Sequence, residues 1–189
     1  FSMNLYLPVL PELTEQLGTT AALAQLTMTA CLVGLAGGQL IIGPLSDRYG
    51  RRKPLLLGTA AYVVASLVCA WAPNIMVLLV ARLLQGLAAS AGMVIALAAG
   101  RDVYSGRKLV AYYGRFTMLS GLAGAISPVI GGALASFIDW RGSFIALAIL
   151  GAVVLAATFF GLPETLPAAR QASPAIARSR DDAESPSFF

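Results

Sequence analysis

The sequence predicts an all-helical membrane protein. Of its 189 residues, 58% are apolar and only 12% are charged, whereas a soluble domain carries about 25% charged residues. This is too little charge to cover a water-facing surface. The charged residues are also separated by five stretches of 18 to 31 residues that contain no Asp, Glu, Lys or Arg. Because a helix needs about 20 apolar residues to cross a bilayer, each stretch predicts one spanning helix.

The five predicted spans follow one another with short connections. They cover residues 23–44, 55–71, 75–100, 109–137 and 144–161. Residues 1–10 are apolar but begin without an initiator Met or a charged segment, so they do not resemble a signal peptide. We expect them to be the end of a truncated helix 1. The transmembrane bundle then covers residues 1–163, and a solvated linker of mixed Ser, Ala, Pro and charged residues covers 164–189.

Basic residues gather in alternate connections and predict the orientation of the spans. Two connections hold most of them: Arg48, Arg51, Arg52 and Lys53 in one, and Arg101, Arg107 and Lys108 in the other. The connections on the opposite side carry few charges, among them Glu12, Glu15, Asp139 and Arg141. Because basic loops stay in the cytoplasm, the amino end and the tail are expected there too.

The residues that catalysis or metal binding would need are missing or scattered. The sequence contains no His, and Cys31 and Cys69 fall inside two predicted spans, where a small apolar role is typical. It also contains no nucleophile and base constellation and no phosphate-binding loop. We therefore expect no enzyme activity, no cofactor and no metal. Since topology explains the positive charges, we expect no nucleic-acid partner either.

Residues 43–53, with the sequence GPLSDRYGRRK, form the most specific motif. Gly43 and Pro44 are expected to end a helix, Asp47 to accept hydrogen bonds or face a positive helix end, and Gly50 to permit a tight turn. Three arginines offer planar groups for paired hydrogen bonds: Arg48, Arg51 and Arg52. A basic cytoplasmic anchor would explain the same charges without fixing their order.

This segment resembles the signature loop between helices 2 and 3 of major facilitator transporters. Further segments resemble the drug:proton antiporters that confer bicyclomycin or chloramphenicol resistance. These segments are LYLPVLP from Leu5, RLLQGLAAS from Arg82, RDVY from Arg101, SPVIGG from Ser127, WRGSF from Trp140 and LPET from Leu162. The resemblance implies a twelve-helix fold of two six-helix bundles in the bacterial inner membrane, with substrate near the midplane and alternating access. This chain would be the amino-terminal bundle, and its partner the missing carboxyl-terminal bundle.

Arg82 is a charge inside a predicted span. It lies 8 residues beyond Asn74, the expected outer boundary, which is about 12 Å at 1.5 Å per residue. A charge at this depth is costly and usually faces the bundle interior or a cavity, and Gln85 shares its helix face. Arg82 could be a structural residue that only binds neighbouring carbonyls. The resemblance instead implies a role in proton coupling.

Small residues recur every four positions in the predicted span 109–137. They are Ser120, Gly124, Pro128 and Gly132. Such a stripe lets helices approach closely, and Pro removes one backbone hydrogen bond. Ordinary membrane packing would explain it. The resemblance implies that Gly124, Pro128 and Gly132, like the 43–53 motif, act in conformational gating, although Ser127 stands where the family usually has Gly.

The resemblance also implies a substrate cavity, with Asn4, Tyr6, Gln85 and Met93 as its candidate residues. Asn4 stands where helix 1 of the family commonly has an acidic residue, and an amide cannot carry a proton. Every carboxylate of the sequence falls in a predicted connection, at a predicted helix end or in the tail. An acid that carries the proton must then lie in the absent start of helix 1 or in the other bundle, or it does not exist.

The favoured function is therefore secondary active export of small amphiphilic drugs in exchange for protons, within membrane lipid. Two alternatives stay open at this point. One is transport of a sugar or another metabolite on the same fold. The other is a truncated fragment that does not transport.

Overall fold

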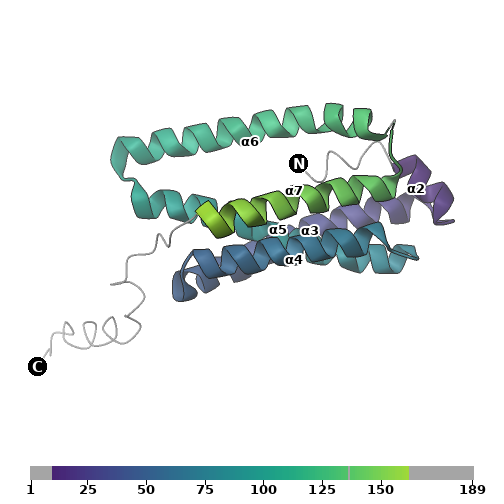
Figure 1. The fold of residues 1–189 in the computed structure, drawn as a ribbon, viewed down its shortest axis with the longest axis horizontal. Helices are drawn as coiled ribbons and strands as arrows, with labels where there is room; N and C mark the ends of the chain where they lie inside the picture. Colours follow the sequence, from purple (N-terminus) through teal and green to yellow (C-terminus); the bar gives the residue numbers. More distant parts are fainter. Residues whose placement is uncertain (1–9, 136, 162–189) are drawn as a thin grey trace, which may run out of the picture.

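The computed structural model describes residues 10–135 and 137–161, and these form α-helices joined by short connections. The helices are α2 (Leu10–Gln16), α3 (Ala21–Tyr49), α4 (Arg52–Ala70), α5 (Ile75–Val103), α6 (Gly106–Ala135) and α7 (Trp140–Gly161). Five of them, α3 to α7, are long and apolar enough to cross a membrane. The long helices run back and forth along one direction (Figure 1). The predicted all-helical fold with five spans is confirmed.

Two predicted spans end too early, at Pro44 and at Gly100, and α7 begins at Trp140 instead of Phe144. Helix α3 continues through Gly43 and Pro44 to Tyr49, so these two residues do not end it. Pro44 removes only one backbone donor, which a membrane helix tolerates. At the other site, α5 runs to Val103 and α6 begins at Gly106, which leaves only residues 104–105 between them.

The basic residues of this second connection consequently lie on helix ends rather than in a loop. Arg101 belongs to the last turn of α5, whereas Arg107 and Lys108 belong to the first turn of α6. Gly106 has a φ of +55°, a conformation that favours glycine and allows the chain to reverse there. The charged residues mark where a helix leaves the bilayer, but the backbone hydrogen bonds of the helix continue beyond that point.

Glycines let α3 and α5 pack against each other at very short range. A Cβ atom at Gly34 would collide with the backbone carbonyl of Leu83, and one at Gly86 would collide with that of Cys31. Only residues without a side chain permit such an approach between two helices. The pair forms the centre of the described bundle, and α4 packs against both α5 and α7.

An apolar cluster ties the described helices together at the end where α2 lies. Trp140, Phe144 and Leu13 are fully buried in it. The Trp140 Nε1 donates a hydrogen bond to Gln16 Oε1 at 2.8 Å. Arg141 lies over the Trp140 ring at 4.6 Å and donates from Nη1 to the Ala70 carbonyl at 2.8 Å. These contacts join α2, the end of α4 and the start of α7.

Helix α6 stands apart from the other long helices (Figure 1). Only 11% of its most apolar stretch is buried within the structure, against 33% to 44% for the other four spans. Its anchoring contacts lie near its beginning, where Tyr112 and Tyr113 donate hydrogen bonds to the Ala96 and Leu97 carbonyls at 2.9 and 3.2 Å. Among the described residues, α6 packs only lightly, against α5 near its start and against α7.

The alternation of the helices predicts which residues can be reached from each side of the membrane. Arg107 and Asn74 are both exposed and lie at opposite ends of the bundle. In a protein whose Cys31 and Cys69 have been replaced, Asn74→Cys should react with an impermeant maleimide in intact cells. Arg107→Cys should react only after the membrane is permeabilised. The reverse pattern would contradict the predicted orientation, and the cysteine-free parent gives the background.

Candidate functional site

Arg82 lies at one end of a buried chain of hydrogen bonds between α5 and α4. Its Nη1 donates to Gln85 Oε1 at 2.9 Å, and Gln85 Nε2 donates to Ser66 Oγ at 2.7 Å. Ser66 Oγ in turn donates to the Tyr62 carbonyl at 2.7 Å. Arg82 and Gln85 meet because residues three apart share a helix face. The side chains of Arg82, Gln85 and Ser66 are all 0% exposed.

A third helix reaches the same guanidinium. The Cζ atom of Arg82 lies 5.5 Å from the centre of the Phe144 ring on α7, within the range of a cation–π contact. The prediction that Arg82 faces the interior and shares a face with Gln85 is confirmed. Ser66 and Phe144 were not predicted as site residues. Phe144 belongs to the WRGSF segment, but Ser66 carries no signal beyond being a polar residue in an apolar span.

A second charged cluster lies at the opposite end of the bundle from Trp140. Arg51, just before α4, donates from Nε to Asp102 Oδ2 of α5 at 2.9 Å and from Nη1 to Ser46 Oγ of α3 at 2.7 Å. The same Nη1 is 2.6 Å from Asp47 Oδ1. The side chains of Arg51 and Asp102 are 6% and 3% exposed, whereas Asp47 is 66% exposed. Arg51 therefore joins three helices.

The two carboxylates stabilise the charged form of Arg51. Burial by itself lowers the pKa of Arg51, but hydrogen bonds from its guanidinium to Asp102 and Asp47 more than compensate, so that its pKa is raised. The guanidinium of Arg51 therefore stays protonated at every physiological pH. Arg51 is thus a permanent centre of the cluster, and it is too buried to be a solvated basic anchor.

The other residues of the 43–53 motif take different places. Gly50 has a φ of +88°, which confirms the predicted tight turn. Arg48 is exposed, and its Cζ lies 5.5 Å from the ring of Tyr49. Arg52 donates from Nη2 to the Phe159 carbonyl at the end of α7, at 2.9 Å. Gly43 is part of α3, and a Cβ there would meet no described atom within 4 Å.

Asp102 is a further functional candidate that the sequence does not predict. In the sequence it stands beside Arg101 in a predicted basic loop, where it counts only as a partial neutralising charge. The structure places it on the last turn of α5 and buries it against Arg51. Its membership in the RDVY segment is the only signal that could have drawn attention to it.

The small-residue stripe lies on α6, away from both clusters. A Cβ at Gly124 or Gly132 would meet no described atom within 4 Å. Pro128 is exposed, and Ser127 is fully buried with its Oγ donating to the Ala123 carbonyl at 2.9 Å. The stripe leaves room for a closely approaching neighbour, and the gating role of Gly124, Pro128 and Gly132 stays a prediction.

The candidate cavity residues are not brought together. Asn4 and Tyr6 lie outside the described residues. Gln85 is buried beside Arg82, whereas Met93 is 46% exposed and accepts a weak contact from Gln39 Nε2 at 3.8 Å. Neither Gln85 nor Met93 lines a cavity that lies between α4, α5 and α7. Their assignment to a substrate cavity stays a prediction.

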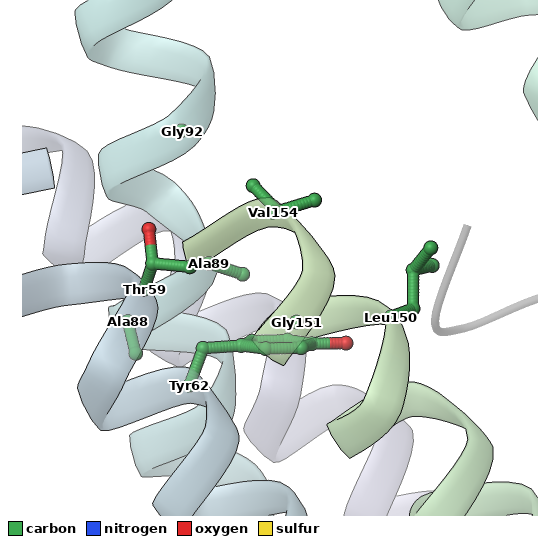
Figure 2. Close-up of a pocket in the computed structure, with 8 residues that line it drawn as sticks. All are labelled: Thr59, Tyr62, Ala88, Ala89, Gly92, Leu150, Gly151 and Val154. Atoms are coloured by element: carbon green, nitrogen blue, oxygen red, sulfur yellow. The ribbon is translucent and has the colours of Figure 1, made fainter. Parts of the chain in front are cut away.

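That cavity has a volume of about 220 Å³ and is mostly apolar (Figure 2). It is lined by Thr59, Tyr62, Ala88, Ala89, Gly92, Leu150, Gly151 and Val154. The Tyr62 ring packs on Gly151, where a Cβ atom would lie 2.9 Å from Tyr62 Cδ1. The cavity is separate from the charged cluster around Arg51, and it shares Tyr62 with the hydrogen-bond chain that ends on Arg82.

Known proteins are similar to this chain over nearly its whole length. Residues 1–185 fit the model of the Major Facilitator Superfamily. The MFS-type transporter YdgK of Bacillus subtilis is 42% identical over 180 residues, which are 94% of this chain and 45% of YdgK. A chloramphenicol resistance protein of Pseudomonas aeruginosa is 41% identical over 166 residues, covering 86% of this chain and 39% of that protein. The chain spans less than half the length of these relatives.

A solved structure supports the fold. The crystal structure of the human organic anion transporter MFSD10 superposes with a TM-score of 0.67 at 21% identity. The superposition covers 89% of this chain and 45% of the human one. The described helices therefore match about half of that fold.

The two carboxylates around Arg51 should differ in their contribution to stability. Asp102→Asn is expected to lower the free energy of unfolding by about 3 kcal/mol, because Arg51 would keep a buried charge and lose its buried partner. Asp47→Asn should cost less than about 1 kcal/mol, because its carboxylate is mostly solvated. Unfolding of the purified variants in mixed micelles of increasing denaturing detergent measures both. Equal losses would contradict the assigned burial.

Proposed function

Because the chain belongs to the major facilitator superfamily, a family of transporters and not of enzymes, we propose that it exports small amphiphilic drugs in exchange for protons. It would do so as the amino-terminal bundle of a two-bundle protein in the bacterial inner membrane. The 41% identity to a chloramphenicol resistance protein supports a drug as the substrate. The observation that carries the proposal is the charge of Arg82, which is fully buried within a membrane-spanning helix.

A buried guanidinium can couple two processes without titrating itself. Arg82 stays charged, so its effect must come from a partner that changes. That partner is a carboxylate that gains and loses a proton, or a substrate that displaces it. Among the described residues whose side chains are placed, the carboxylates of Glu15, Asp47, Asp102 and Asp139 lie at helix ends or in connections. The proton-carrying acid therefore belongs to another part of the transporter, such as the second bundle.

The cluster around Arg51 supplies the conformational lock in this proposal. Arg51 and Asp102 hold the ends of α3, α4 and α5 together, and the carboxylate of Asp47 is mostly exposed while it pairs with Arg51. In an alternating-access cycle two bundles rock against each other. Asp47 would bind the second bundle in one state and release it in the other. The open stripe of Gly124, Pro128 and Gly132 on α6 would let that bundle approach closely.

Membrane lipid is the remaining partner. Large apolar side chains are exposed along every long helix, with Leu40 80% exposed, Leu57 70% and Phe160 86%. Such surfaces are stable only in contact with hydrocarbon or with another helix. The basic residues at the helix ends support a cytoplasmic position of the amino end and the tail.

Substitution of Arg82 tests the coupling. In the full-length protein reconstituted into liposomes, Arg82→Met should abolish the efflux of labelled chloramphenicol that an imposed pH gradient drives. Arg82→Lys should leave about a tenth or less of this efflux, because lysine keeps the charge but lacks the planar guanidinium that makes paired hydrogen bonds. Both variants should still insert and bind the drug. Arg107→Met, which removes an exposed arginine of α6, is the matched control. Normal pumping and pH dependence of Arg82→Met would make Arg82 a structural residue.

Substitution of Asp47 tests the lock. Asp47→Asn should slow efflux about tenfold or more, because one charged contact between the two bundles would be lost. Expression and membrane insertion should stay unchanged. Glu15→Gln removes an exposed carboxylate at the opposite end and should transport normally. Initial rates in everted vesicles measure both. If Asp47→Asn is fully active, the 43–53 motif only anchors the chain.

A further inference from the structure

Building on the proposed coupling role of Arg82, we infer that Ser66 is a positioning residue for it. Ser66 lies on α4 and does not touch Arg82 in the chain of hydrogen bonds, which runs from the Tyr62 carbonyl through Ser66 and Gln85 to the guanidinium. Its effect is to fix which end of the Gln85 amide faces Arg82.

The direction of each hydrogen bond follows from the first one. A backbone carbonyl can only accept, so the hydroxyl proton of Ser66 is committed to the Tyr62 carbonyl at 2.7 Å. Ser66 Oγ can then only accept from its other neighbour, which requires Gln85 to present its NH₂ group at 2.7 Å. The Gln85 oxygen is thereby turned toward Arg82, where it accepts from Nη1 at 2.9 Å.

Without Ser66 the orientation of the amide is no longer determined. An amide rotated by half a turn would place its NH₂ group against the guanidinium, and two donors cannot bond. Water is not available to replace the missing partner, because Ser66, Gln85 and Arg82 are all 0% exposed. A buried donor or acceptor that loses its partner is strongly disfavoured, so the guanidinium would move to seek another acceptor.

The anchor of the chain is itself fixed in place. Tyr62 packs its ring on Gly151 of α7 at the edge of the apolar cavity (Figure 2), while Phe144 of α7 lies 5.5 Å from Arg82. Helix α7 therefore supports both ends of the chain. The guanidinium of α5 is held at a position that α4 and α7 define together.

This positioning should be visible in the pH dependence of transport. A guanidinium close to a carboxylate lowers the pKa of that carboxylate. When Arg82 is held less well, the lowering is smaller and the pKa of its acidic partner rises. In Ser66→Ala the pH at which drug efflux is half-maximal should therefore move upward, by about half a unit to one unit.

The experiment measures chloramphenicol efflux by the full-length protein in proteoliposomes from pH 6 to 9. Gln85→Met interrupts the chain at its second link with a side chain of similar size, and it should shift the profile in the same direction as Ser66→Ala. The matched control is Ser90→Ala. Ser90 is also 0% exposed, but it donates to the Leu87 carbonyl of its own helix at 2.7 Å. Its removal should leave the profile in place.

Arg82→Met is measured alongside, so that the two proposals can fail separately. If Arg82→Met loses proton-driven efflux while Ser66→Ala and Gln85→Met keep the normal pH profile, the coupling role stands and the positioning role of Ser66 is overturned. The same holds if Ser90→Ala shifts the profile as much as Ser66→Ala. If Arg82→Met transports normally, the coupling role and the positioning role fall together. A shift that is shared by Ser66→Ala and Gln85→Met and absent in Ser90→Ala supports the inference.

Discussion

Inside a bilayer no water is available to solvate a polar group, so each one must find its partner within the protein. This constraint explains the arrangement of three of the arginines that join different helices. Arg82 is bound through Gln85 in mid-span, Arg51 binds Asp102 at one end, and Arg141 binds backbone carbonyls at the other. Helices α3, α4, α5 and α7 take positions at which these demands are met together.

The same constraint divides the described chain into a rigid part and a loosely attached one. Gly34 and Gly86 bring α3 and α5 into backbone contact, and the buried arginines fasten α4 and α7 to them. Helix α6 takes part in neither arrangement, because its two hydrogen bonds to α5 come from Tyr112 and Tyr113 near its start. A transporter that alternates between two states needs both a fixed reference and an element that can change its contacts.

The fold and part of the candidate site could be predicted from the sequence. Long stretches without charge identify membrane helices because the cost of burying a charge is large, and the same cost makes Arg82 conspicuous. The sequence predicts helix ends too early at Pro44 and Gly100, because polar residues mark the edge of the bilayer and not the last backbone hydrogen bond of the helix. Asp102 and Ser66 could not be found, because their importance depends on which helices are neighbours. That information is absent from the local pattern.

The position of the tyrosine contacts near the start of α6 has a geometric consequence. From Tyr113 to the end of the helix at Ala135 the distance is about 33 Å at 1.5 Å per residue. A rotation of about 10° around the tyrosine contacts would carry the far end roughly 6 Å, about one helical turn. The residues at the tyrosine contacts would barely move in such a rotation. A small rotation at the start of α6 therefore corresponds to a much larger displacement near Ala135, where the chain leads into α7.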